Sequence, residues 1–262
     1  MKKNKKIKIL ITGGAGFIGY HLAKNLSKEC IVDLVDNLSR GKVDKDFKKL
    51  IKEKNVRLLN FDLNDKIKIN SKDYDYIFHL AATIGVEKVI KNPFNVLNNN
   101  YLSTLSVIKF AQKQKKLKKL FFTSTSEIYS GSFKNKLIKF PTKENSILSL
   151  NEMNSARGTY MLSKIYCEAL CHFSNIPFII LRPHNIFGER MGMSHVIPEL
   201  IKKIHKSKKN LELNNSSHKR SFCYIGDAVN MMILLMKNSR AINNTYNLGD
   251  PNNEISILDL AK

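Results

Sequence analysis

The chain has 262 residues, a formal net charge of +22 and a hydrophobic content of 43%. This length and hydrophobic content predict one sizeable globular domain with room for a small additional lobe. No apolar run reaches membrane-spanning length and the basic N-terminus lacks the pattern of a signal peptide, so the sequence predicts a cytoplasmic protein with no part in the membrane.

The positive charge raises the question of whether nucleic acid or a membrane surface is the partner. The lysines are spread along the chain, mostly on the polar faces or at the ends of expected helices. Arginine is scarce, and no basic stripe interleaved with aromatic residues occurs. We therefore do not expect nucleic acid as the main partner, whereas an anionic substrate would benefit from the positive field.

The cysteines and histidines form no metal-binding pattern. The spacing of Cys30, Cys167, Cys171 and Cys223 fits no zinc site, and the histidines show no ligand spacing with supporting carboxylates. Cys167 and Cys171 lie one helical turn apart and are expected to be small core residues. We expect no metal and a reducing compartment.

An apolar run followed by a glycine-rich turn opens the chain. Residues 9–12 predict a buried strand, residues 21–26 a helix, and the turn between them contains Gly13, Gly16 and Gly19. This order is typical of a dinucleotide-binding site, in which Gly16 lets the backbone approach a pyrophosphate and Gly19 lets the helix pack on the strand. The helix N-terminus would offer free N–H groups to the phosphates.

An acid at the end of the next strand supports the same interpretation. Residues 30–36 predict a second strand, with Asp36 at its carboxyl end. A carboxylate at this place hydrogen-bonds the adenosine ribose and repels a 2′-phosphate, which favours NAD over NADP. The alternative is a glycine turn in a phosphate-free α/β protein, with Asp36 a solvated loop acid.

The remaining elements alternate between strand and helix patterns as far as Pro183. The expected helices are 43–54, 93–113 and 158–174, and the expected strands are 56–61, 76–82, 120–124 and 177–183. This alternation predicts an α/β fold, a doubly wound parallel sheet (Rossmann fold), over residues 1–183.

The pattern becomes irregular beyond Pro183, and residues 184–262 are expected to form a small C-terminal substrate lobe. The expected elements are a loop at 184–193, a helix to residue 206, a strand at 221–225, a helix at 228–237 and the start of a helix at 255–262. This last helix has neither cap nor stop signal, so that the lobe is expected to be truncated at its C-terminus.

Two groups of polar residues could carry chemistry. Tyr160 and Lys164 stand at i and i+4 on one helix face, where an ammonium would lower the pKa of the phenol and make it a general base. Such a pair is also a common surface coincidence. Residues 123–129 follow a strand, where Glu127 is a candidate acid or base; the alternative is a polar loop in which Ser124 or Thr125 caps a turn.

In combination these motifs resemble the extended short-chain dehydrogenase/reductases of the nucleotide-sugar epimerase/dehydratase family, over about residues 8–262. The matching motifs are the glycine turn at 12–19, Asp36, the Asp62 and Leu63 pair, H-L-A-A at 79–82, Thr125 four residues before Tyr129, Tyr160 with Lys164, R-P-x-N-x-x-G at 182–188 and R-x-F at 220–222.

The resemblance implies NAD as a tightly held cofactor and a nucleotide sugar as substrate. The implied cofactor-binding residues are Gly13, Gly16, Phe17, Ile18, Gly19, Asp36, Asn37, Asp62, Leu63, Leu80, Ala81, Ala82, Asn100, Tyr160 and Lys164. The implied substrate-binding residues are Thr125, Asn185, Val196 and Arg220. The implied catalytic residues are Thr125, Glu127, Tyr160 and Lys164.

By resemblance, Tyr160 removes the proton of a sugar 4-hydroxyl while NAD takes the hydride, giving a 4-keto sugar nucleotide. Epimerases return the hydride to the other face, dehydratases expel water, and decarboxylases of the UDP-glucuronate type lose carbon dioxide. The triplet at 125–127 and Arg157 resemble dehydratases and decarboxylases. We expect an epimerase/dehydratase, with a decarboxylase as the alternative.

Two further expectations concern partners. Relatives often pair helices across a homodimer interface, for which residues 96–111 and 161–173 offer apolar positions. From another class, a non-catalytic dinucleotide-sensing or nucleic-acid-associated protein is the rival interpretation, supported by the charge and the short C-terminus.

Overall fold

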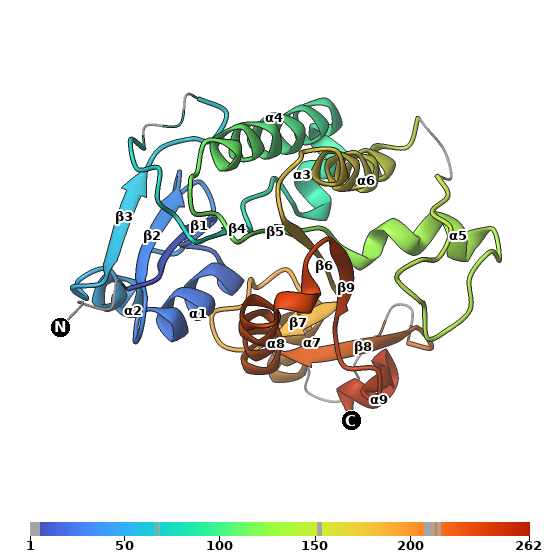
Figure 1. Cartoon of the computed structure of the whole chain (residues 1–262). Coiled ribbons are helices and arrows are strands. Elements are labelled where there is room, and N and C mark those ends of the chain that lie inside the picture. The colour runs from blue at the N-terminus through green and yellow to red at the C-terminus, as the bar shows by residue number, and fades with distance from the viewer. Residues whose placement is uncertain (1–5, 66, 68, 151–153, 207–212, 214–215) are drawn as a thin grey trace.

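The computed structural model describes residues 6–65, 67, 69–150, 154–206, 213 and 216–262. A seven-stranded, fully parallel sheet with the strand order β3-β2-β1-β4-β5-β6-β9 forms its centre, and a three-stranded sheet with the order β10-β8-β7 lies beside it (Figure 1). The strands of the large sheet are β1 (Lys8–Thr12), β2 (Ile31–Asp36), β3 (Val56–Asn60), β4 (Tyr76–His79), β5 (Lys119–Thr123), β6 (Phe178–Pro183) and β9 (Asn244–Leu248).

Helices cover both faces of the large sheet, which confirms the predicted doubly wound fold. The helices are α1 (Phe17–Leu26), α2 (Lys45–Leu50), α3 (Val86–Lys91), α4 (Pro93–Gln112), α5 (Ser130–Lys134), α6 (Ala156–His172), α7 (Val196–Lys206), α8 (Ile225–Lys237) and α9 (Ile257–Ala261), with short 3₁₀ turns η1 (Ser126–Tyr129) and η2 (Ser239–Ala241). The small sheet contains β7 (Asn185–Phe187), β8 (Lys219–Tyr224) and β10 (Glu254–Ser256).

Alternation along the central strand divides the core into two layers. In β1, Ile9 and Ile11 face the layer formed with α1 and α8, whereas Leu10 faces the layer formed with α4 and α6. Successive side chains of a strand point to opposite faces, so an uninterrupted apolar run is what a strand covered on both sides requires. Figure 1 shows α4 and α6 on one side of the sheet and α1 with α8 on the other.

Several short elements were not predicted. Residues 185–187, predicted as loop, form β7, which pairs with β8; residues 244–248 form β9, which completes the large sheet beside β6. The helix start predicted at 255–262 is present as α9, but its first two residues belong to β10 and the expected lack of a cap is wrong. Ser256 caps α9 by accepting a hydrogen bond from the Asp259 backbone N–H at 3.0 Å. Strands β7 and β9 have only three and five residues, too few for the apolar alternation of a strand to be recognised in the sequence.

The last third of the chain contributes to both sheets. Strand β9 and helix α8 lie within residues 184–262, yet both pack with the large sheet. Lys119, buried at the start of β5, donates hydrogen bonds to the carbonyl oxygens of Leu235, Met236 and Asn238 at 2.6–2.9 Å. A cation at the carboxyl end of a helix satisfies its last carbonyls and opposes its dipole. The ammonium of Lys119 therefore fastens α8 to the sheet.

The four cysteines are free and buried, and Cys167 and Cys171 lie in the core as predicted. Among the residues that the structure describes, no helix has the length and hydrophobicity needed to cross a membrane.

Candidate active site

The glycine turn forms a cradle between β1 and α1. Gly13 has φ +72°, and a Cβ atom on it would lie 2.8 Å from the backbone nitrogen of Ala81. A Cβ on Gly19 would lie 2.2 Å from the carbonyl oxygen of Gly13. Both positions therefore require glycine. Gly16 precedes α1 without a side-chain cap, and no acid occurs in the first turn. The N–H groups of Phe17 and Ile18 remain free of intrahelical partners, as an anion site needs.

The predicted ribose acid lies directly beside this cradle. The Asp36 carboxylate accepts hydrogen bonds from the backbone N–H of Ala15 at 3.0 Å and of Leu38 at 2.8 Å. Asn37 donates to Asp62 at 2.7 Å, which brings two predicted adenosine contacts together. The adjacent Leu63 is buried in the core layer under α4.

A buried histidine connects the cradle to the helices. The hydroxyl of Thr104 donates to the Asn100 carbonyl at 2.8 Å, so it must accept from His79 Nε2, 3.1 Å away. His79 Nδ1 then accepts from Thr12 Oγ1 at 2.7 Å, and Thr12 in turn accepts from the Ala81 N–H at 3.3 Å. Burial lowers the pKa of His79 to about 3, with a further contribution from Lys164. The ring is therefore neutral and acts as a fixed spacer.

Asn100 lies at the end of this chain of hydrogen bonds and is buried. Its side chain accepts from the Thr83 N–H at 2.7 Å and donates to the Thr83 carbonyl and to Ser163 Oγ at 3.2 and 3.1 Å. Asn100 thus joins the segment after Leu80, Ala81 and Ala82 to α6, the helix of Tyr160.

Three predicted catalytic residues lie together at the carboxyl end of β5. Thr125 Oγ1 accepts from the Glu127 N–H at 3.2 Å, which caps η1 and leaves the hydroxyl proton available for donation. The side chain of Thr125 also hydrogen-bonds Tyr160 and lowers its pKa. Thr125 therefore caps the turn and contacts Tyr160 at the same time, so its interpretation as a cap does not exclude its interpretation as a catalytic residue.

The protonation of Tyr160 differs from the prediction. Burial and the charge of Glu127 raise the pKa of the Tyr160 phenol, while Thr125 and Arg40 lower it by smaller amounts. The predicted lowering by Lys164 is wrong for this structure. The Lys164 ammonium lies 5.9 Å from the centre of the Tyr160 ring and donates instead to the Thr123 carbonyl at 2.8 Å.

Lys164 is buried with its charge. Burial lowers its pKa from 10.5 to about 8, so holding the charged form at pH 7 costs about 3 kcal/mol of folding free energy. Replacing Lys164 with Met removes this cost and loses one hydrogen bond worth about 1 kcal/mol. We expect Lys164→Met to raise the free energy of unfolding by about 2 kcal/mol at pH 7, measured by urea denaturation.

The pH dependence of the stability difference between Lys164→Met and the wild-type protein tests whether the buried charge causes the gain. Between the folded pKa of about 8 and the ordinary value of 10.5, the unfolded state binds more protons than the folded state. The stability of the wild-type protein should therefore rise with pH relative to the Met variant, and the difference should shrink above pH 8. A difference that stays constant up to pH 10 would contradict the assignment.

The substrate side of the site comes from the small sheet. Asn185 on β7 donates to the Ser221 carbonyl on β8 at 3.0 Å, and Arg220 precedes Ser221 on the same strand. The charge of Arg220 acts on Glu127, as does that of Arg157. Burial nevertheless raises the pKa of the Glu127 carboxyl. The fold therefore brings Glu127 under the influence of two cations and beside Tyr160.

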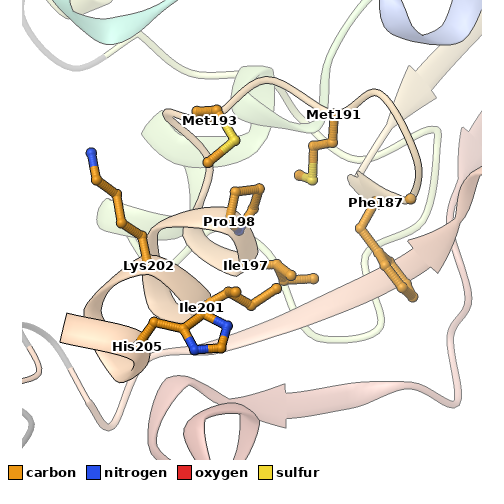
Figure 2. A pocket seen from close by; sticks show the side chains of 9 residues that line it. Phe187, Met191, Met193, Ile197, Pro198, Ile201, Lys202 and His205 are labelled. Carbon is orange, nitrogen blue, oxygen red and sulfur yellow. The ribbon is translucent and has the colours of Figure 1, made fainter. Parts of the chain in front are cut away.

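An apolar pocket of about 490 Å³ lies between Phe187 at the end of β7, the segment after it and helix α7. Figure 2 shows side chains from both parts around it. Its apolar side chains are Phe187, Met191, Met193, Ile197, Pro198 and Ile201. Four of them belong to the segment 191–198, which contains the loop before α7 and the first turn of this helix. Val196, the first residue of α7, lies within this segment but does not line the pocket.

Sequence reasoning missed Arg40 as a residue of the site. The charge of Arg40 lowers the pKa of Tyr160. The pKa of His195, which precedes α7, is lowered mainly by burial and also by the charge of Arg40. The loop that carries Arg40 packs on the cradle, since a Cβ on Gly41 would lie 2.4 Å from that of Ala15. The sequence shows a basic residue four positions after Asp36, but the direction in which its side chain points depends on the conformation of the loop.

A buried network supports η1 from behind. Arg182 Nε and Nη2 donate to the two carboxylate oxygens of Glu168 at 3.0 and 2.7 Å, and Nη1 donates to the Tyr129 hydroxyl at 2.6 Å. Tyr129 in turn donates to Asn247 on β9 at 2.9 Å. Arg182 therefore joins β6, α6 and η1, the turn that presents Thr125 and Glu127.

The site has the features that a dinucleotide requires. The glycine cradle, the uncapped N-terminus of α1 and the Asp36 carboxylate fit the phosphates and a ribose. At the carboxyl end of β5, the buried hydroxyls of Thr123 and Ser124 have no hydrogen-bond partner among the residues that the structure describes. Within the described part of the chain, no three His, Cys, Asp or Glu side chains cluster as a metal site would need.

Residues 9–249 match the model of the family described as "NAD dependent epimerase/dehydratase family". The chain is 31% identical to a dTDP-D-glucose 4,6-dehydratase of Dictyostelium discoideum, over 97% of this chain and 61% of the relative. It is 32% identical to a UDP-N-acetyl-alpha-D-glucosaminuronate decarboxylase of Bacillus cytotoxicus, over 88% of this chain and 71% of that protein. The chain therefore spans about three fifths to seven tenths of these relatives.

Solved structures show the same architecture. A UDP-glucuronic acid 4-epimerase from Bacillus cereus, in complex with UDP-glucuronic acid and NAD, superposes with a TM-score of 0.80 at 26% identity. The superposition covers 97% of this chain and 80% of that one. The similarity thus includes both the large sheet and the smaller one.

Proposed function

Since the chain belongs to the NAD dependent epimerase/dehydratase family, we propose that it is an NAD-dependent enzyme that acts on a nucleotide sugar through a 4-keto sugar intermediate. The observation that carries this proposal is the meeting of Thr125, Glu127 and Tyr160 at the carboxyl end of β5, beside Lys164. A protein that only sensed a dinucleotide would have no use for this set.

The chain's own residues supply the proton transfer. The proton transfer needs Tyr160 as the phenolate, a form that burial and Glu127 disfavour and that Thr125 and Arg40 favour. In that form Tyr160 takes the proton of the sugar 4-hydroxyl as general base, and Thr125 donates a hydrogen bond to the same oxygen as it becomes a carbonyl. Lys164, held by the Thr123 carbonyl, keeps donors for the cofactor ribose. NAD, when bound, supplies the hydride acceptor. The phosphates are held by the cradle of Gly13, Gly16 and Gly19 and by the N–H groups that follow.

Glu127 distinguishes the possible second steps. Burial raises the pKa of the Glu127 carboxyl, which favours its protonated form, while the charges of Arg157 and Arg220 lower this pKa. Expulsion of water requires an acid at the leaving hydroxyl, and a substrate carboxylate requires cations. The acid supports a dehydratase, and the two arginines support the alternative, decarboxylation of a uronic acid.

The test is mass spectrometry of nucleotide sugars incubated with the purified protein and NAD. Loss of water would identify a dehydratase, loss of carbon dioxide a decarboxylase, and an unchanged mass with inverted stereochemistry an epimerase. No reaction across UDP-, dTDP- and GDP-sugars, with NAD bound, would contradict the proposed activity and favour a sensor.

The nucleotide base has a candidate place in the apolar pocket. Its volume of about 490 Å³ falls in the range of small-molecule sites, and its walls suit a flat, weakly polar ring. Asn185, by resemblance a phosphate contact, is two residues from Phe187 in the wall. We assign Arg220 to the diphosphate of the same substrate and Val196, at the start of α7, to the side of the base.

A homodimer through α4 and α6 belongs to the proposal. Phe94 and Tyr101 lie seven residues apart on α4, and Tyr166 and Phe173 lie seven apart at α6, which puts each pair on one helix face. The rings of Tyr101 and Tyr166 are 5.4 Å apart, and Phe94 and Phe173 are 75% and 85% exposed. This apolar stripe supports a partner surface.

A charge placed in this stripe tests the dimer. We expect Tyr166→Glu to convert a dimer into a monomer in light scattering, because a buried carboxylate without a partner is costly. Leu234→Glu, at an exposed position of α8 outside the stripe, would serve as the control. A wild-type protein that elutes as a monomer would exclude the dimer.

A further inference from the structure

Arg190 lies in the turn after β7 and reaches back to the cofactor side of the molecule. Its side chain is only 9% exposed, although the residue stands in an irregular segment. The guanidinium carbon lies 4.0 Å from the centre of the Tyr20 ring, and Tyr20 is a buried residue of α1. Arg190 therefore stacks on the helix whose N-terminus forms the phosphate cradle.

The same guanidinium binds the loop that follows Asp36. Arg190 Nη1 donates to the carboxylate of Asp44, and Nη2 donates to the Lys42 carbonyl at 3.0 Å. We name residues 37–44 the cofactor loop, since it begins beside Asp36 and packs on the cradle through Gly41. The hydrogen bonds from Arg190 hold the pKa of the Asp44 carboxyl below its usual range. One side chain thus contacts α1 and the far end of the cofactor loop.

The backbone at Arg190 and Glu189 has an unusual conformation and further contacts that hold Arg190 in place. Arg190 has φ +67°, in the left-handed region that a residue with a side chain adopts at a cost. Neighbouring Glu189 is fixed separately: its carbonyl is 2.9 Å from His21 Nε2 on α1, and its carboxylate accepts from the Tyr224 hydroxyl at 3.1 Å. The turn after β7 is therefore fastened to α1 and to β8, independently of the cofactor loop.

We propose that Arg190 is a positioning residue that ties the cofactor loop to the substrate lobe and thereby slows the release of NAD. The proposal rests on the proposed function, because it assumes that NAD occupies the cradle. The loop can leave the cradle only after Arg190 gives up Asp44 and Lys42. Since the turn that carries Arg190 lies between Asn185 and α7, the same contact links cofactor retention to the substrate-binding segment.

Lysine cannot replace this arginine. A single ammonium cannot stack flat on Tyr20 while it donates to both the Asp44 carboxylate and the Lys42 carbonyl. We expect Arg190→Lys to accelerate NAD release about tenfold and to raise the KM for NAD, with kcat at saturating NAD unchanged. A purely structural role would lower kcat and the thermal midpoint of the NAD-free protein instead.

Asp44→Asn provides a second variant that keeps the fold. Asp44 also caps α2 by accepting from the Phe47 N–H at 2.9 Å, and asparagine preserves this cap while it removes the charge. The fold-increase in the rate of NAD release should be smaller in the double variant than the product of the fold-increases in the two single variants, because both changes break the same contact. Arg240→Lys, at the exposed turn η2, is the control and should leave the rate unchanged.

The experiment measures NAD release by displacement in stopped flow. Faster release in both Arg190→Lys and Asp44→Asn, with a normal rate in Arg240→Lys, would support the proposal. Equal rates in wild type and Asp44→Asn would overturn it, even if Arg190→Lys did not fold. A wild-type protein that binds no NAD would instead refute the proposed function, so the two failures are distinguishable.

Discussion

Replacing Tyr160 with phenylalanine is expected to lower turnover of the nucleotide sugar at least about 100-fold, because general acid–base catalysis contributes about 10²–10⁴. The change removes only the hydroxyl that hydrogen-bonds Thr125. The ring remains on α6, and the glycine cradle and Asp36 are untouched, so NAD should still bind. Turnover is measured with the substrate found by mass spectrometry, and NAD binding by calorimetry.

The matched control is Tyr246→Phe, which removes a hydroxyl on β9 away from the cluster of Thr125 and Tyr160. It should leave turnover unchanged. Full activity in Tyr160→Phe would contradict the role of the phenol as general base. Glu127, whose pKa is raised by burial, would then be the candidate acid or base.

The second large effect concerns stability. Glu168→Ala is expected to lower the free energy of unfolding by about 3–5 kcal/mol, because it leaves the buried guanidinium of Arg182 without its counter-charge. Both side chains are only 6% exposed and the pair is bidentate. Urea denaturation at pH 7 measures the loss. Activity should also fall, since Arg182 positions η1 through Tyr129.

An exposed ion pair supplies the comparison. Lys91 and Glu87 form a 2.7 Å pair at i and i+4 with both side chains largely exposed. Glu87→Ala should cost far less than Glu168→Ala, because solvent screens an exposed pair. If Glu168→Ala costs no more than Glu87→Ala, water or a shifted side chain compensates Arg182 and the network does not support the site as described.

Local patterns in the sequence determined the cofactor half of the molecule. The strand, glycine turn and helix at residues 9–26, with Asp36 after the next strand, are consecutive in the chain, so their spacing alone predicts the cradle. Tyr160 and Lys164 share a helix face because the helical repeat makes i and i+4 neighbours. The apolar runs of the central strands likewise predict burial on both faces.

Only the tertiary structure decided what the charges do. Lys164 lies on the correct face but donates to the Thr123 carbonyl, so it does not lower the pKa of Tyr160 as the spacing suggested. Arg40 influences Tyr160, and Arg190 reaches Asp44, 146 residues away in the chain. Long side chains have many rotamers, and their partners come from distant segments, so no local period specifies these contacts.

The tertiary structure also decided which short segments form strands. β9 has the sequence Asn-Thr-Tyr-Asn-Leu, too polar and short to predict, yet it completes the large sheet because β6 offers an unpaired edge beside it. The sequence therefore determined the elements that carry their own pattern. Pairing between distant segments determined the rest, including the joining of the C-terminal residues to both sheets.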